Sequence, residues 1–136
     1  MEPTAWPHPR PPTLLLIDDQ DPVRAALAAG LARRGFAVHT AANAGEAIEV
    51  YRQHGPEIDL VLLDVRMPGV DGPQTLAALQ TIDPSIRCCF MSGEIGDYTE
   101  KDLLACGGKR VLQKPFHLAE LAQSLRQLID ERLHAD

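Results

Sequence analysis

The sequence has few cysteines, no long apolar segment and no excess of positive charge, and each of these absences excludes a class of protein. Its three cysteines, Cys88, Cys89 and Cys106, form neither a CxxC pair nor an even set for disulfide bonds, which favours a reducing compartment. No segment approaches the roughly 20 apolar residues needed to cross a bilayer, and the N-terminus lacks the apolar core of a signal peptide. We therefore expect a cytoplasmic protein that does not bind membranes.

A basic surface for nucleic acid is also missing. The formal net charge is -6, the isoelectric point is near 5.3, and no run of five like charges forms a basic arm or an acidic tail. Direct binding to DNA or RNA is therefore not expected, because the phosphate backbone attracts a basic surface.

The length of the chain suits one globular domain. It has 136 residues, of which 45% are hydrophobic, and this leaves no room for a second domain. Residues 1–12 contain five of the eleven prolines and no apolar periodicity. We therefore expect a flexible tail over residues 1–12 that lies outside the fold, and one domain over residues 13–134.

Five short apolar segments have the composition of β-strands, and each is followed by a helical pattern. The strands are predicted at residues 13–17, 36–41, 59–63, 86–91 and 110–113. The helices are predicted at residues 22–34, 44–54, 73–83, 99–106 and 118–129, with Asp21 and Asn43 as N-caps. This alternation predicts an α/β fold, a parallel sheet with helices on both faces, in which ligands bind outside the carboxyl ends of the strands.

Polar side chains follow the predicted strands at those carboxyl ends. Asp18 and Asp19 follow the first strand, Asp64 the third, Ser92 the fourth and Lys114 the fifth. Three carboxylates in one crevice repel one another unless a cation joins them, and oxygen ligands of this kind suit Mg²⁺. Lys114 offers a positive charge to phosphate oxygens, and Ser92 offers a hydroxyl donor. These are the parts of a phosphoryl-transfer site.

Asp64 is the candidate nucleophile of this site. In "LVLLDVRMPGVDG" it follows four apolar residues and precedes a loop with Met, Pro and two glycines, which can admit a phosphodonor. Formation of an aspartyl phosphate is an established use of a carboxylate. Asp18 and Asp19 are better placed to hold the metal ion.

Four motifs together resemble the receiver domain of the response regulators of bacterial two-component signalling. They are "LLLIDDQDPVR", "DLVLLDVRMPGVDG", "FMSGE" and "VLQKPF", in this order and at these spacings, and the resemblance covers residues 13 to about 134. It implies a (βα)₅ flavodoxin-like fold and a phosphorelay switch that is not an enzyme in the usual sense. Such a domain takes a phosphoryl group from a histidine kinase or a histidine phosphotransfer protein onto the residue that matches Asp64.

The resemblance also implies a role for each site residue. Mg²⁺ would be bound by the side chains of Asp19 and Asp64, by Asp18 through a water molecule, and by the backbone carbonyl of Arg66. Ser92 would bond the phosphoryl group and move toward it on activation, and Lys114 would pair with a phosphoryl oxygen. The peptide bond between Lys114 and Pro115 would be cis, a geometry that an X-Pro bond permits.

The sequence departs from the family pattern at the output surface. Val111 stands where the family often has an aromatic residue, three positions before the lysine, so the usual coupling of serine movement to an aromatic side chain is in question. "GGKR" stands where a Gly-Ala-acidic stretch is common. We therefore expect unusual signalling from the face formed by the fourth helix, fifth strand and fifth helix, through which a downstream protein or a second copy would bind.

Arg66 and Glu94 lie two residues after the phosphoacceptor and two residues after the serine. We hypothesise that they form an ion pair that shields the acyl phosphate from water.

Two other functions remain open at this stage. One is a Mg²⁺-dependent phosphohydrolase with Asp64 as nucleophile, although such folds usually have a general-acid aspartate at the position of Arg66. The other is a degenerate receiver that only binds partners or dimerises. This alternative stays open because Val111 replaces the aromatic residue that the family often uses in switching. A zinc site is not expected, because the five histidines are scattered without metal-ligand spacing.

Overall fold

The computed structural model describes residues 7–93 and 98–133 as one five-stranded parallel sheet with helices on both faces. The strands are β1 (Thr13–Ile17), β2 (Ala37–Ala41), β3 (Leu60–Asp64), β4 (Cys88–Ser92) and β5 (Gly108–Gln113). The helices are α1 (Asp21–Arg33), α2 (Ala44–His54), α3 (Gly72–Ile82), α4 (Glu100–Ala105) and α5 (Leu118–Leu133), with a 3₁₀ turn η1 (Gly55–Glu57) after α2. The strand order is β2-β1-β3-β4-β5, so the predicted (βα)₅ fold is confirmed.

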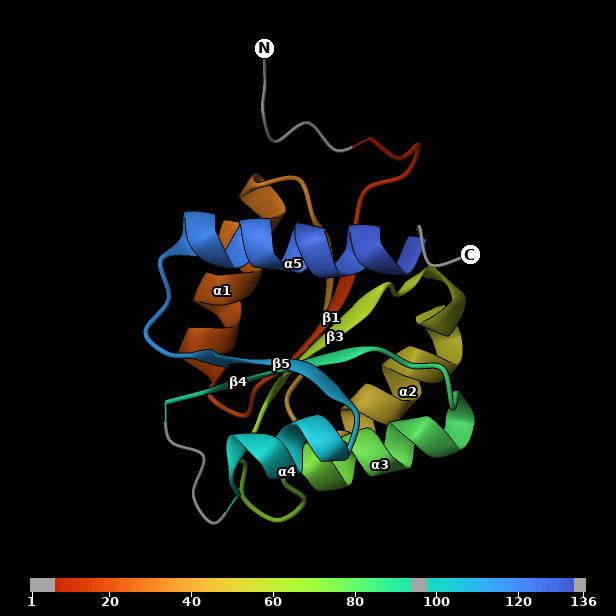
Figure 1. Ribbon diagram of the computed structural model, residues 1–136, viewed down its shortest axis with the longest axis vertical. Helices are drawn as coiled ribbons and strands as arrows, with labels where there is room; N and C mark the ends of the chain where they lie inside the picture. Colours follow the sequence, from red (N-terminus) through yellow and green to blue (C-terminus); the bar gives the residue numbers. More distant parts are fainter. Residues whose placement is uncertain (1–6, 94–97, 134–136) are drawn as a thin grey trace.

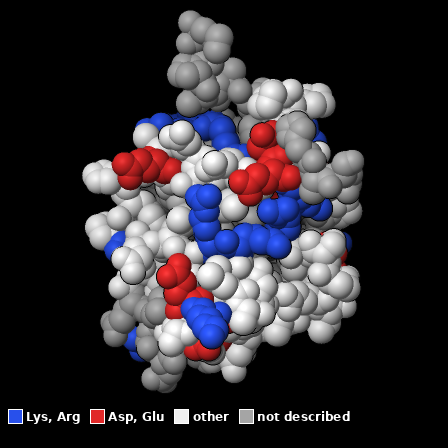
Figure 2. Space-filling model, viewed as in Figure 1, with Lys and Arg blue, Asp and Glu red and all other residues white. Residues whose placement is uncertain are grey.

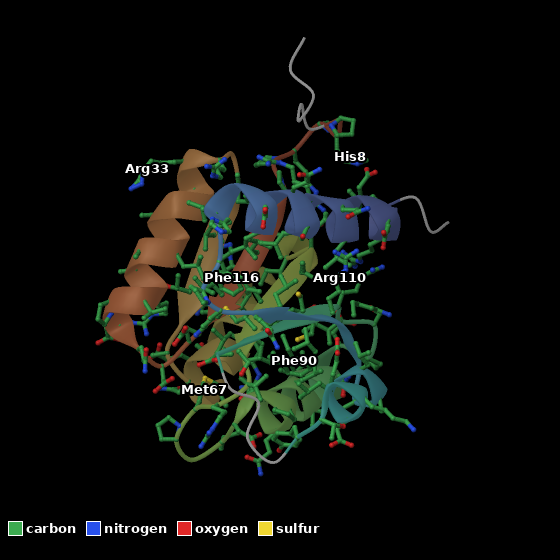
Figure 3. All side chains as sticks on the ribbon, turned by 60° about the vertical axis from the view of Figure 1, so that its left-hand side comes forward. His8, Arg33, Met67, Phe90, Arg110 and Phe116 are labelled. Carbon is green, nitrogen blue, oxygen red and sulfur yellow. The ribbon has the colours of Figure 1, made fainter. Side chains whose placement is uncertain are left out.

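The sheet separates two apolar layers (Figure 1). Helices α1 and α5 cover one face, and α2, α3 and α4 cover the other. Leu14 and Leu16 pack with α1 and α5, whereas Leu15 and Ile17 pack on the opposite side. The same alternation places Phe90 of β4 toward α3 and α4 (Figure 3). Both faces of the central strands are therefore buried, which explains their continuous apolar runs.

Local signals set the helix ends. The Oδ1 atom of Asn43 accepts a hydrogen bond from the backbone N–H of Glu46 at 2.9 Å, as its predicted role as N-cap requires. Gly35, with φ of 95°, follows the last turn of α1. The prediction of Asp21 as the N-cap of α1 is wrong by one residue. Gln20 is the N-cap, and the carboxylate of Asp21 instead pairs with Arg24 Nη2 at 2.6 Å.

Several predicted strand ends also shift by one or two residues. Strand β3 begins at Leu60 and includes Asp64, and β4 begins at Cys88 and includes Ser92. The ladder between β1 and β3 starts with the pair Leu14–Leu60, and the Asp59 carboxylate just before it binds Arg10 and the backbone N–H of Thr13. Among the described residues, no helix combines the length and apolar character needed to span a membrane.

The described part of the proline-rich segment, residues 7–12, contacts the domain. It forms no helix or strand, but Arg10 makes two hydrogen bonds to the carboxylate of Asp59, with Nη1–Oδ2 and Nη2–Oδ1 distances of 2.9 and 2.5 Å. The backbone N–H of Ala37 donates to the carbonyl oxygen of Pro12 at 2.9 Å. His8 lies against α5, with its Nε2 atom 2.6 Å from Asp130 Oδ1 (Figure 3). Proline content does not indicate these contacts, and the boundary between a tail and the domain at residues 12 and 13 stays a prediction.

Candidate functional site

The carboxyl ends of four strands bring the predicted site residues to one edge of the sheet. They are Asp18 and Asp19 after β1, Asp64 at the end of β3, Ser92 at the end of β4 and Lys114 after β5. Asp18 is fully buried, and Asp64 and Ser92 are only 7% and 2% exposed. One carboxylate oxygen from each of the three aspartates lies within 4.8 Å of the others. The structure therefore joins residues that lie up to 96 positions apart in the sequence.

The backbone around Asp64 is held by a close approach of α3. The backbone N–H of Gly72 donates to the carbonyl oxygen of Val65 at 2.8 Å. A Cβ atom on Gly72 would contact the carbonyl oxygen of Asp64 and lie 2.8 Å from the Cα atom of Val65. Only glycine fits there without a shift of the backbone, a requirement that sequence reasoning missed because it treated Gly72 as an ordinary turn residue.

The ammonium group of Lys114 lies between two of the carboxylates. Its Nζ atom is 3.2 Å from Asp18 Oδ2 and 3.6 Å from Asp64 Oδ1. The backbone N–H of Lys114 donates to the carbonyl oxygen of Ser92 at 2.9 Å, which fixes β5 beside β4 at the site. The Lys114–Pro115 bond is cis, as the resemblance implies.

The β1–α1 connection is fixed by Asp18. Its Oδ1 atom accepts a hydrogen bond from the backbone N–H of Gln20 at 3.0 Å, while Arg24 Nη1 donates to its carbonyl oxygen at 2.8 Å. Asp18 is therefore held by hydrogen bonds at both its side chain and its backbone. Asp19, which is partly exposed, is the more accessible of the two carboxylates.

The electrostatics of the site leave negative charge in excess. The pKa of Asp64 is raised to about 6, because the effects of burial and of the Asp18 and Asp19 charges outweigh the lowering effect of the charge and hydrogen bond of Lys114. One lysine faces three carboxylates, so a divalent cation would relieve the remaining repulsion. The donor set consists of carboxylate oxygens, which Mg²⁺ prefers, and the residues present therefore fit this ion.

An open pocket of about 620 Å³ lies above Asp64. It is lined by Gln20, Asp64, Arg66, Ser92, Gly93 and Lys114. A Cβ atom on Gly93 would meet no heavy atom closer than the Cβ atom of Lys114 at 4.0 Å, so the space beside Ser92 is open. Arg66 is exposed at this pocket, but Glu94 lies outside the described residues, and their ion pair remains a hypothesis.

Val111, where the family often has an aromatic residue, is half-buried against the core beside Phe90 in the sheet register. An aromatic residue from another position packs against the same core cluster, namely Tyr98 in the connection just before α4. The Tyr98 hydroxyl donates to Asp71 Oδ2 at 2.7 Å, and Asp71 is the N-cap of α3. This link between the β3–α3 and β4–α4 connections has no signal in the sequence.

Two of the histidines are not scattered in space. The rings of His39 and His54 stack with centroids 4.4 Å apart, and both face the carboxylate of Glu57. The sequence argument against histidine clustering is therefore wrong for this pair, because 15 positions separate residues that the β2–α2 unit brings together.

Comparison with protein families and with solved structures gives consistent results. Residues 14–126 match the family described as "Response regulator receiver domain". A crystal structure of a CheX-CheY-BeF3-Mg complex from Borrelia burgdorferi is similar to the chain with a TM-score of 0.79, 31% identity, and coverage of 88% of this chain and 90% of that one.

Curated relatives match the same region. The sensor kinase CckA of Brucella abortus is 38% identical over 120 residues, which are 88% of this chain but 13% of that protein. Sporulation initiation phosphotransferase F of Bacillus subtilis is 31% identical over 118 residues, which are 85% of this chain and 92% of that protein. The transcriptional regulatory protein PrrA of Mycobacterium tuberculosis is 34% identical over 51% of its length. The chain thus spans only part of CckA and of PrrA.

Proposed function

The chain belongs to the response regulator receiver family and is a phosphoacceptor receiver domain of two-component signalling, and we propose that Asp64 is its phosphoacceptor. The observation that supports this assignment is the placement of Asp64 beneath the open pocket, 3.6 Å from Lys114 Nζ and within 4.8 Å of the Asp18 and Asp19 carboxylates. The phosphoryl group would come from a phosphohistidine of a histidine kinase or of a phosphotransfer protein.

The proposed reaction is an in-line transfer to Asp64. One carboxylate oxygen of Asp64 attacks phosphorus and forms a new O–P bond while the P–N bond to the donor imidazole breaks. The electron pair of the broken bond stays on the imidazole nitrogen, which takes up a proton from water. Asp64 must be ionised to attack, and with a pKa of about 6 it is mostly ionised at neutral pH.

Mg²⁺ is the metal that the oxygen donors fit, and it would supply positive charge to the phosphoryl oxygens when bound. We propose that Asp19 and Asp64 hold it by their side chains and Arg66 by its backbone carbonyl. Asp18 is fully buried and already accepts bonds from Gln20 and Lys114, which supports contact through a water molecule rather than directly. The solved CheY complex from Borrelia burgdorferi, which contains magnesium, supports the choice of ion.

Lys114 and Ser92 would bind the transferred group. The Lys114 ammonium, now shared between Asp18 and Asp64, would pair with a phosphoryl oxygen, since the acyl phosphate adds negative charge at that point. The hydroxyl of Ser92 lines the same pocket and would donate to a second phosphoryl oxygen. The domain then acts as a signalling switch, catalysing only its own phosphorylation and dephosphorylation. A phosphohydrolase of this kind would need a general-acid aspartate two residues after the nucleophile, and this chain has Arg66 at that position.

The proposed output surface is the face of α4, β5 and α5. Lys109 on β5 is exposed and Arg110 partly so. Lys and Arg side chains form a band across this view of the molecule, with acidic side chains above and below it (Figure 2). We propose that a downstream protein or a second copy binds here. We expect the protein to act in the cytoplasm.

The decisive experiment is incubation with Mg²⁺ and acetyl phosphate, followed by intact mass measurement. The parent should gain one phosphoryl group, and Asp64→Asn should gain none. Asp71→Asn is a matched control, because Asp71 is a nearby aspartate that caps α3 and faces Tyr98 rather than the site. An unlabelled parent, or equal labelling of the Asp64 variant, would overturn the proposal.

A further inference from the structure

A second group of metal-ligating side chains lies at the β2 edge of the sheet. It consists of His39 in the middle of β2, His54 at the last residue of α2, and Glu57 in the η1 turn. His39 and His54 are partly buried and Glu57 is exposed, so solvent reaches the group. Because η1 precedes the start of β3 whereas Asp64 ends it, the group lies toward the opposite end of the sheet from the phosphoacceptor.

A single oxygen atom of Glu57 faces both imidazoles. Its Oε1 atom is 3.2 Å from His54 Nδ1 and 4.0 Å from His39 Nε2. Ligand atoms bound tetrahedrally to one zinc ion at about 2.0–2.1 Å stand about 3.3 Å apart. All three ligand atoms lie within 4.8 Å of one another. Because the two imidazoles are stacked and a metal ion binds in the plane of the ring, one imidazole must rotate out of the stack for both nitrogens to bind the same ion.

The surroundings leave the Glu57 carboxylate available to a cation. The cationic side chain of Arg10 lies beside Glu57, but its guanidinium binds the Asp59 carboxylate and donates to the backbone carbonyl of Glu57 at 3.4 Å. The two stacked imidazoles repel each other if both are protonated, and a shared metal ion binds them in their neutral form.

We propose that His39, His54 and Glu57 form a site for one Zn²⁺ ion, with a water molecule at the fourth position. Two imidazole nitrogens and one carboxylate oxygen are a zinc donor set, and they do not suit Mg²⁺, which prefers oxygen ligands. The two metal sites of the domain therefore differ in chemistry as well as in position. Zinc at this site ties the edge strand β2 to the end of α2 and to the turn before β3.

The test is calorimetric titration of the full chain with Zn²⁺ at about pH 7.5, where free imidazoles are mostly neutral, with Mg²⁺ in excess to fill the aspartate site. The parent should bind one equivalent of Zn²⁺. His54→Gln, His39→Thr and Glu57→Gln should each weaken this binding by about tenfold or more, because each removes one of three ligands. His117→Gln is the matched control, since His117 is an exposed histidine outside the group. Cys106→Ser is a second control, since Cys106 is an exposed thiol.

The fold of each variant is checked by acetyl phosphate labelling without zinc, which should equal that of the parent. Should a variant fail to fold, the parent alone decides the question through the NMR signals of its imidazole rings. Zn²⁺ should shift the ring signals of His39 and His54 and leave those of His117 unchanged. Unchanged signals of His39 and His54, or loss of zinc binding in Cys106→Ser alone, would overturn the proposal.

Discussion

Two buried aspartates at opposite ends of β3 differ in how completely they are neutralised. Asp59, before the first residue of β3, is 2% exposed and accepts two hydrogen bonds from Arg10 and one from the backbone N–H of Thr13, with Arg132 Nη1 3.7 Å away. Asp64, the last residue of the strand, faces two other carboxylates and a single lysine. A buried carboxylate surrounded by donors holds the fold together, whereas one left in repulsion is suited to react.

Asp64→Asn is expected to have the largest effect, on phosphorylation rather than on stability. This change should abolish phosphorylation by acetyl phosphate because the nucleophile is lost. It should leave the free energy of unfolding unchanged or raise it, because one of three repelling carboxylates becomes neutral. Urea unfolding without Mg²⁺ measures the second effect. A destabilised variant would show that Asp64, like Asp59, is a structural residue.

Asp59→Asn should show the opposite pattern. The change leaves Arg10 and Arg132 facing a neutral group, but their side chains are 47% and 36% exposed and water can solvate them, so we expect the free energy of unfolding to fall by about 1–3 kcal/mol. The folded protein should still be phosphorylated, because Asp59 lies at the far end of β3 from the site. Urea unfolding and intact mass on the same samples check both parts. Loss of phosphorylation in a folded Asp59→Asn variant would contradict the assignment of Asp59 to a purely structural role.

The free energy of unfolding should also depend on pH through Asp64. Burial and the charges of Asp18 and Asp19 raise the pKa of Asp64 from 3.8 to about 6, so the folded protein keeps a proton that the unfolded chain has lost. The free energy of unfolding should therefore fall as the pH rises from about 4 to about 6, by up to about 3 kcal/mol from this group. In Asp64→Asn this contribution should vanish, and Mg²⁺ should offset it in the parent. Equal slopes for parent and variant without Mg²⁺ would contradict the expectation.

Gly72→Ala should affect both stability and phosphorylation. The new Cβ atom meets the backbone of Asp64 and Val65, so we expect a loss of about 1–3 kcal/mol together with slower labelling of Asp64. Gly69→Ala is a useful comparison, because a Cβ atom there meets nothing within 4 Å although its φ of 77° is strained for alanine. A normal labelling rate in Gly72→Ala would show that the approach of α3 does not position Asp64.

Tyr98→Phe is expected to have the smallest effect. It removes the hydrogen bond from the Tyr98 hydroxyl to Asp71, a carboxylate beside the site that, like Asp59, accepts more than one hydrogen bond. The free energy of unfolding should fall by about 1 kcal/mol. Because this link joins the two connections at the site, the change should also alter the rate at which acetyl phosphate labels Asp64. Thermal unfolding and labelling rates measure the two effects separately.

The strand ends of the site could be predicted because their signals are local. Apolar runs that end in Asp18, Asp64 or Ser92 mark buried strands whose polar residues must meet at the carboxyl edge. The partners of Asp59 could not be predicted in this way. Arg10 lies 49 positions before it in a proline-rich segment, and only the tertiary fold brings the two together.

The same limit applies to the histidines and to Tyr98. His39 faces His54 because β2 is the edge strand and α2 returns along it, which depends on strand order rather than on spacing. Tyr98 reaches Asp71 across two connections whose lengths carry no pairing signal. Long-range contacts between loops are therefore the part of this molecule that the sequence leaves unspecified.

The convergence of Arg10 and Arg132 on Asp59 also determines where other proteins can be attached. Arg10 comes from the first described residues and Arg132 from the last turn of α5, so both ends of the domain are anchored at the amino end of β3. Asp64 lies five residue steps along the strand from Asp59, or about 16 Å. A fluorescent reporter attached beside Arg10 or Arg132 would therefore lie at the end of the sheet remote from Asp64, leaving the docking route of a phosphodonor clear.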